Sequence, residues 1–319
     1  MSLTENLLDW LLDPGDPSLR LRVLVELLGR GADDPEVLQA RHAIPGSPAV
    51  RSLLKSMHPD GYWTQKHAQT GVVSGAGVEY GAFATTHFCL AYLAELGLDS
   101  SHPQVALAAE RYLGLQQPDG DWWQHLSCLQ GYNLRTFIRL GLRQDPRLQR
   151  TVDLLLSSPR RDGGCLCDLH ELKRPRSKSC VRGSAKALLA LAELPETWDH
   201  PRCRELVDYF LRRGGIFRSK NQGELVNDDM GRLSFPLTWR TNAWEILLGL
   251  SRMGYGEDER LAAAWMRLEG QADADGRCRL DWTPSQCPWK VGQRGAPNPW
   301  VTFYVLLAQK WRRAAVRLD

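Results

Sequence analysis

The chain has 319 residues, 43% of them apolar and 24% charged, and its formal net charge is +3. A charge this small excludes the strongly basic class of nucleic-acid-binding proteins, and no apolar run is long enough to span a membrane. The opening residues, MSLTENLLDWLLDPGD, carry acids where a secretory signal carries Lys or Arg, so we expect a cytoplasmic protein. In that compartment its eight cysteines are expected as buried thiols or metal ligands rather than disulfides.

Amphipathic helices are predicted along the chain, because apolar residues recur at three- and four-residue spacing. In chain order the helical segments cover 3–12, 18–29, 89–98, 102–115, 135–142, 145–156, 186–194, 200–211, 244–255 and 303–311. Several of the second helices open with a proline, which suits a first turn because its missing N–H would be unpaired there. No segment has a convincing strand pattern, so the sequence predicts an all-α fold.

An Asp-Gly turn recurs between these helices, with its aspartate at positions 60, 119, 162 and 275. A spacing of roughly fifty residues is typical of an array of supersecondary units. Helical hairpins in such an array bury one face against their neighbours, either in an open superhelix or in a closed ring. The first helix of each pair is the more apolar one, which favours the ring. We therefore predict an α/α toroid, a double-layered barrel of about six helical hairpins, in a single domain spanning 1–319; an open superhelix is the alternative.

The stretch QQPDGDWW at 116–123 resembles the Gln-x-x-Asp-Gly-x-Trp signature of squalene–hopene cyclases. The hairpin period resembles that of the wider terpenoid cyclase/protein prenyltransferase superfamily, over nearly the whole chain. The segments DPSLRLRVLVELLG and 167–188 also look like bacterial cyclase-like proteins. The resemblance implies an α/α toroid, but the superfamily includes cyclases, prenyl transferases, thioether-forming enzymes and non-enzymatic members. The Asp-x-Asp-Asp acid motif of class II terpene cyclases does not occur, which disfavours that reaction.

Three cysteines and a histidine are the candidate metal ligands. Aligning the helix ends at 142 and 194 places Cys128 on Cys180, both at the entry of neighbouring inner helices, and the connection between them supplies Cys167 and His170. Thiolates and imidazole at one opening suit tetrahedral zinc, and converging helix N-termini help to deprotonate thiols. Cys165 competes for one ligand position, although it stands where other repeats have tryptophan.

The role of this zinc is left open by the sequence. Three protein ligands would leave an open position typical of a catalytic zinc, whereas four would make the zinc structural. Superfamily members that bind metal place zinc in the same zone, but their ligand spacing is not reproduced here. The alternative interpretation is that these thiols are small buried apolar side chains.

Polar residues near the predicted inner-helix entries are candidates for the rest of a site. Asp228 and Asp229 form an acid pair in the loop before an inner helix and, with Arg240, are the candidate catalytic residues. Converging arginines favour an anionic ligand such as a carboxylate or phosphate. The candidate substrate-binding residues are Tyr80, His87, Tyr132, Asn133, Arg182 and Asn242. The alternatives are helix capping for the polar residues and a buried core role for His87.

Two functions follow as hypotheses. The first is a zinc-dependent, transferase- or cyclase-like enzyme that acts on a small or isoprenoid-like substrate, anionic or thiol-bearing, at the barrel mouth. The second is a non-catalytic toroid that binds a hydrophobic ligand or a protein partner, with a structural zinc or none.

Overall fold

A computed structural model describes residues 3–13, 15–66, 70–77, 83–123, 125, 127–157, 160–167 and 178–314. This part of the chain is mostly helical. Its α-helices are α1 (Glu5–Leu11), α2 (Pro17–Arg22), α3 (Pro35–Ala43), α4 (Pro48–Lys55), α5 (Thr86–Glu95), α6 (Pro103–Leu113), α7 (Ser127–Phe137), α8 (Pro146–Ser157), α10 (Val181–Leu191), α11 (Pro201–Leu211), α12 (Ala243–Arg252), α13 (Ala262–Glu269) and α14 (Pro299–Arg313). Turns of π-helix continue α2 over Val23–Leu27 and α7 over Ile138–Leu142. Within the described residues, no helix combines the length and the apolar character that a membrane crossing needs.

Two short antiparallel hairpins accompany the helices. Strand β1 (Gln65–Lys66) pairs with β2 (Val73–Ser74), and β3 (Phe217–Arg218) pairs with β4 (Asn221–Leu225). The expectation of a chain without strands is therefore wrong in detail. Three of these four strands are two residues long, which is too short for an alternating pattern to show in the sequence.

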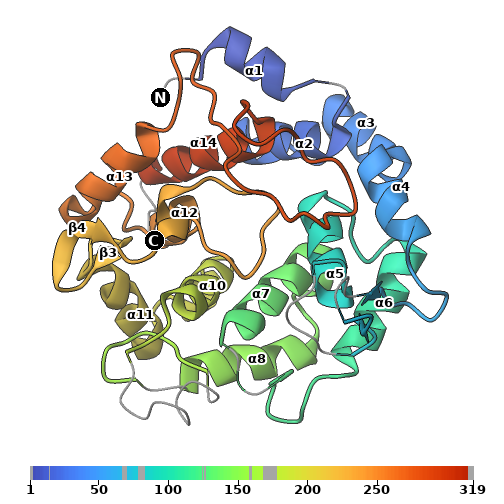
Figure 1. Ribbon diagram of the computed structural model, residues 1–319, viewed down its shortest axis with the longest axis horizontal. Helices are drawn as coiled ribbons and strands as arrows, with labels where there is room; N and C mark the ends of the chain where they lie inside the picture. The colour runs from blue at the N-terminus through green and yellow to red at the C-terminus, as the bar shows by residue number, and fades with distance from the viewer. Residues whose placement is uncertain are drawn as a thin grey trace.

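The helices lie in two layers. Figure 1 shows α2, α5, α7, α10, α12 and α14 in the middle of the molecule, surrounded by α1, α3, α4, α6, α8, α11 and α13. Along the inner layer α5 packs on α7, α7 on α10, α10 on α12, and α12 on α14. Every residue of α5 and α12, and every residue of α10 except Arg182, is buried, whereas the outer helices bury only one side. The more apolar helix of each hairpin is thus the inner one, as the sequence predicts.

Proline and a capping side chain mark the starts of several helices. Asp16 and Asp34 accept backbone N–H groups at the starts of α2 and α3, and Ser47 does so at the start of α4. Each cap is followed directly by a proline, whose missing N–H costs nothing in a first turn. Helices α3 and α4 were not among the predicted segments, although these two signals precede both of them.

Helices α7 and α10 make the tightest contact in the inner layer. A side-chain carbon on Gly131 would lie 2.4 Å from the backbone carbonyl carbon of Lys186, and one on Gly183 would lie 2.3 Å from the Ser127 hydroxyl. Only glycine allows so close an approach. These two glycines therefore set the distance between the two helices whose N-terminal ends carry the candidate metal ligands.

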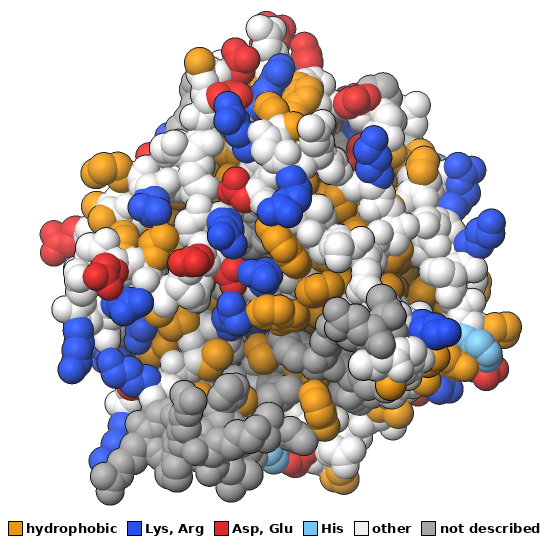
Figure 2. Space-filling model, viewed as in Figure 1, with side chains coloured by type: hydrophobic (Ala, Val, Ile, Leu, Met, Phe, Trp, Pro, Cys, Tyr) orange, Lys and Arg blue, Asp and Glu red, His pale blue; other side chains and the backbone are white. Residues whose placement is uncertain are grey.

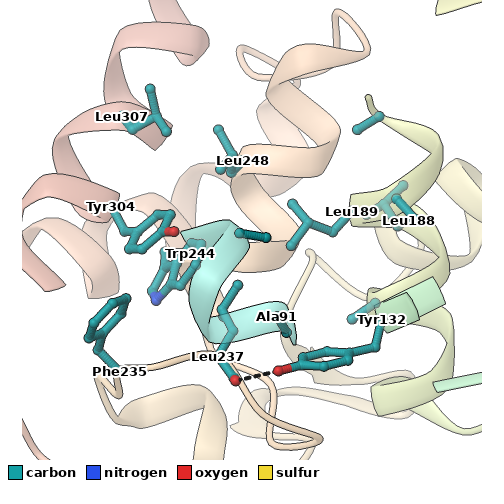
Figure 3. Close-up of a cluster of buried hydrophobic side chains, with 14 of the residues drawn as sticks. Ala91, Tyr132, Leu188, Leu189, Phe235, Leu237, Trp244, Leu248, Tyr304 and Leu307 are labelled. Carbon is teal, nitrogen blue, oxygen red and sulfur yellow. Dashed lines mark hydrogen bonds between the residues drawn. The ribbon is translucent and has the colours of Figure 1, made fainter. Parts of the chain in front are cut away.

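Buried side chains pack in the space between the inner helices. Figure 3 shows Trp244 stacked on Tyr304, with ring centroids 4.0 Å apart, and Phe235 and Leu237 reaching in from the loop before α12. The hydroxyl of Tyr132 donates a 2.8 Å hydrogen bond to the carbonyl of Leu237, which fixes this loop against α7. Phe235 and Leu237 are buried, so the loop packs as part of the core.

A buried ion-pair network lies where the inner helices end. Glu95, the last residue of α5, accepts hydrogen bonds from Arg22, Arg135 and the hydroxyl of Tyr304. Burial alone would raise the pKa of Glu95, but the nearby guanidinium groups lower it to about 2. Residues from α2, α5, α7 and α14 are thereby joined around one carboxylate.

Two further glutamates extend this network. Glu193 accepts hydrogen bonds from Arg139 at 3.1 Å and Arg252 at 2.6 Å, and Glu26 pairs with Arg22, Arg139 and Arg252. Burial would raise the pKa of both glutamates, but the arginines lower it. The network has one more arginine than glutamate, which complements the negative ends of the helix dipoles that meet there.

Candidate functional site

Two arginines from different segments meet at one carboxylate beyond the N-terminal ends of α10 and α12. Arg182, in the first turn of α10, donates a 2.7 Å hydrogen bond to Asp229, and Arg240, just before α12, donates one of 2.6 Å to its other oxygen. Both guanidinium groups also lie on the ring of Trp239, at 4.7 and 5.1 Å from its centroid. The arrangement combines charge-assisted hydrogen bonds with cation–π contacts.

The local chain conformation explains how these groups are held. Asp229 lies in a 3₁₀ turn, Asp228–Gly231, and its side chain is only 8% exposed. Asn242 begins α12 with a capping box, in which its side chain and that of Glu245 exchange hydrogen bonds with the backbone. The side-chain oxygen of Asn242 also accepts the N–H and hydroxyl of Ser234, which fixes the loop that carries Arg240.

The arginines remain accessible from solvent. The side chain of Arg182 is 37% exposed and that of Arg240 is 28% exposed. Arg240 also lies 4.6 Å from the centroid of Trp282, whose ring meets Phe83 edge to face. The two guanidinium groups share one buried carboxylate here, and aromatic surface lies beside them. Figure 2 shows basic and acidic side chains side by side near the middle of the face that it presents.

The structure brings together some of the predicted site residues. Asp229, Arg240 and Arg182 form a single cluster, in which Arg182 comes from a segment 47 residues before Asp229. Asp228 is exposed on the same turn, while Asn242 lies at the start of α12 as its cap. Tyr80 lies outside the described residues.

The remaining predicted substrate-binding residues lie in the core. His87 is buried against the rings of Phe88, Tyr112 and Tyr132, and burial lowers its pKa to about 3. The side-chain amide of Asn133 donates a 3.3 Å hydrogen bond to the hydroxyl of Tyr112. These groups form one buried aromatic and polar cluster between α5, α6 and α7, as the alternative interpretation of His87 expects.

A buried charged pair beneath the arginine cluster was not predicted. Lys186 of α10 donates a hydrogen bond to Glu245 of α12, and both side chains are almost fully buried. Burial lowers the pKa of Lys186, and the carboxylate of Glu245 opposes this shift. The lysine also lies 5.9 Å from the ring centroid of Tyr132. The signal in the sequence was Asn242-x-x-Glu245, the spacing of a capping box.

The cysteines singled out as ligands lie around the start of α10. Cys128 is in the first turn of α7, and Cys180 is the residue that caps α10. The N–H of Cys180 donates a 2.7 Å hydrogen bond to the carbonyl of Cys165. Cys167, two residues after Cys165, is buried. All eight cysteines lie in the described part of the chain, and none of them forms a disulfide.

The described residues alone do not supply a complete metal site. Among them, no group of three or more His, Cys, Asp or Glu side chains has the arrangement that could hold a metal ion. His170 lies outside the described residues. Burial raises the pKa of Cys165 to about 11, which opposes the thiolate that a metal requires. Zinc binding therefore stays a prediction that depends on Cys128, Cys167 and Cys180 together with His170.

Neither a protein-family model nor a curated protein matches the sequence. Among solved structures, the chain is similar to a protein from Actinoplanes, with 16% identity and a TM-score of 0.47 over 85% of this chain and 75% of that one. It is also similar to the type II terpene cyclase MstE from Scytonema, with 16% identity and a TM-score of 0.33 over 86% and 98% of the two chains. A variant of MstE in complex with its substrate, geranylgeranyl dihydroxybenzoate, matches with 15% identity and a TM-score of 0.33 over 86% and 96%.

Proposed function

We propose that the protein is a single-domain α/α toroid, like the terpenoid cyclases, that binds an anionic ligand at the mouth where its inner helices begin. The observation that carries this proposal is the convergence of Arg182 and Arg240 on Asp229 and Trp239. A carboxylate between two guanidinium groups marks the position that an oxyanion prefers. The partly exposed arginines keep N–H groups within reach of a ligand that approaches from solvent.

The filled interior supports binding at the mouth. Phe235 and Leu237 occupy the space in front of Trp244 and Tyr304, so a ligand would rest on Trp239 and Trp282 rather than run through the middle of the ring. Aromatic faces beside cationic groups suit a ligand with an anionic head and an apolar body. An isoprenoid-like anion is the ligand that the resemblance to terpenoid cyclases implies.

Titration with inorganic pyrophosphate tests this proposal. The indole N–H signals of Trp239 and Trp282 are followed by NMR in the full-length protein. We expect saturable shifts, and we expect Arg240→Gln to weaken binding by about tenfold or more because a charge-assisted contact is lost. Arg51→Gln makes the same charge change on an exposed position of α4 and should leave binding unchanged. Equal binding by both variants would contradict the proposal.

A zinc-dependent, transferase- or cyclase-like enzyme is the second candidate. It is supported by the positions of Cys128, in the first turn of α7, and Cys180, the residue that caps the adjacent inner helix α10. Elemental analysis of the purified protein tests it. Stoichiometric zinc that is lost in Cys180→Ala and kept in Cys203→Ala, a buried cysteine of α11, would support this candidate. Metal-free wild-type protein would remove it.

A further inference from the structure

A buried ion pair lies one helical turn beneath the arginine cluster. Lys186 comes one turn after Arg182 on α10, so the two side chains emerge on the same side of the helix. The ammonium group of Lys186 donates a hydrogen bond to the carboxylate of Glu245 on α12, and the two side chains are only 2% and 0% exposed. The pair therefore joins the helix that carries Arg182 to the helix that Arg240 precedes.

Stability alone is a poor reason for two charges in this position. An ion pair taken out of water loses hydration that its mutual attraction only partly returns, and well-packed apolar side chains of similar volume often stabilise a fold equally well. Such a pair can instead fix one arrangement of packed elements, because a shifted arrangement leaves a charge buried without its partner. The elements that this pair can fix are α10 and α12, which pack on each other.

The other carboxylate oxygen of Glu245 holds the loop before α12. It accepts hydrogen bonds from the backbone N–H of Asn242 at 2.8 Å and from the side-chain amide of the same residue at 3.1 Å. The amide oxygen of Asn242 accepts the N–H and the hydroxyl of Ser234 at 3.0 and 2.8 Å. Because Arg240 lies just before Asn242, an unbroken chain of hydrogen bonds runs from Lys186 to the loop that carries this arginine.

The ring of Tyr132 gives this loop a second connection to the lysine. The ammonium nitrogen of Lys186 lies 5.9 Å from the centroid of the ring. The hydroxyl of Tyr132 donates a 2.8 Å hydrogen bond to the carbonyl of Leu237, which belongs to the same loop as Arg240 (Figure 3). A displacement of Lys186 would therefore reach the loop through both α12 and α7.

We propose that Lys186 and Glu245 are the positioning residues of the anion site, an inference that rests on the proposed function. They fix α10 against the start of α12, so that Arg182 and Arg240 meet at one oxyanion position. Neither residue contacts the ligand, because both side chains are buried. Anion affinity depends on the pair, since a preorganised site spends no binding energy on bringing its groups together.

A double variant that removes both charges tests the proposal. Lys186→Met with Glu245→Gln leaves neither charge of the pair buried alone, and glutamine keeps the acceptor oxygen of the capping box. The full-length protein is titrated with inorganic pyrophosphate, and the indole N–H signal of Trp239 is followed by NMR before and during the titration. We expect a shifted Trp239 signal before pyrophosphate is added, because both arginines lie on this ring. We also expect binding that is weaker by about tenfold, because the arginines no longer converge.

Glu95→Gln is the matched control for lost stability. It makes the same change at a buried glutamate where the inner helices end, so it should lower the melting temperature without changing the pyrophosphate affinity or the Trp239 signal. Glu245→Gln alone is a milder variant that should weaken binding in the same direction. It decides the question if the double variant does not fold.

An unchanged Trp239 signal in the double variant would overturn the proposal, and so would an unchanged affinity where the wild type binds pyrophosphate. Equal weakening of binding in Glu95→Gln would also overturn it, because the loss would then follow stability rather than the position of the arginines. A wild-type protein that does not bind pyrophosphate contradicts the proposed function instead. The Trp239 signal of the ligand-free variants then decides alone whether the pair positions the arginines.

Discussion

The guanidinium group of Arg22 donates a 3.2 Å hydrogen bond to the backbone carbonyl of Glu95, the last residue of α5. It also pairs with the side-chain carboxylate of the same residue at 3.2 Å. These contacts join the first inner helix, α2, to α5 across the part of the inner layer where helix packing is sparse. The ion-pair network is therefore expected to hold α2 to the rest of the inner layer.

Glu95→Gln is expected to lower the free energy of unfolding by about 3–5 kcal/mol, because it leaves Arg22 and Arg135 buried with less compensating charge. Urea denaturation followed by circular dichroism measures this change. Glu196→Gln removes the exposed partner of Arg143 and should cost less than about 1 kcal/mol. Similar losses in both variants would contradict a special role for the buried network.

The burial of His87 makes stability depend on pH. Burial lowers its folded-state pKa to about 3, below the roughly 6.5 of an unfolded histidine, so the unfolded chain binds the proton more readily. The stability that comes from burying a neutral His87 is fully present above pH 6.5 and is lost as the pH falls towards 3. When the pH falls from 6.5 to 4.5, the free energy of unfolding of His87→Leu should decrease by about 2 kcal/mol less than that of the wild type. His42 is exposed, so His42→Gln should keep the wild-type pH dependence of stability. If His87→Leu also kept the wild-type pH dependence, a buried neutral histidine would be contradicted.

Gly131→Ala tests the close contact between α7 and α10. The added methyl group would meet the backbone of Lys186 and Ala187 at 2.4–2.5 Å, so the helices must move apart at a cost of about 1–3 kcal/mol. Gly46→Ala has no atom within 4 Å of the new methyl group and should be close to neutral. Thermal unfolding of the two variants gives the comparison, and equal melting temperatures would show that the helices are not in this contact.

Cysteine labelling distinguishes the buried thiols from the accessible ones. Burial raises the pKa of Cys165 to about 11, so at pH 8 only about one Cys165 side chain in a thousand is a thiolate. Cys180 is partly exposed and should react with iodoacetamide before Cys165. Peptide mapping by mass spectrometry reads the order of labelling. Labelling of Cys165 as fast as Cys180 would contradict the burial of this segment.

The apolar helices could be predicted from the sequence because apolar residues recur at three- and four-residue spacing in each inner helix. Helices α3 and α4 were missed because they are short and half polar, although Asp34-Pro35 and Ser47-Pro48 signal their starts. Both helices lie in the outer layer, where a helix buries only one side and needs few apolar residues.

The sequence also pointed to parts of the site. Arg182, Asp229 and Arg240 were singled out, but their meeting at one carboxylate depends on how α10 and the loop before α12 pack. The glutamates of the ion-pair network carry a signal that was overlooked. Glu26, Glu95 and Glu193 are each followed by leucine near the end of an inner helix, so the same position of the repeat is acidic three times. Each of these glutamates pairs with an arginine from another helix, so the pairing could not be predicted before the helix packing was known.

A crystal structure of the protein with pyrophosphate tests the central claim most directly. The account predicts a pyrophosphate oxygen within hydrogen-bond distance of Arg182 and Arg240, over the face of Trp239, with Asp229 displaced or sharing the arginines. Pyrophosphate bound only elsewhere on the surface, with Asp229 still holding both arginines, would contradict it.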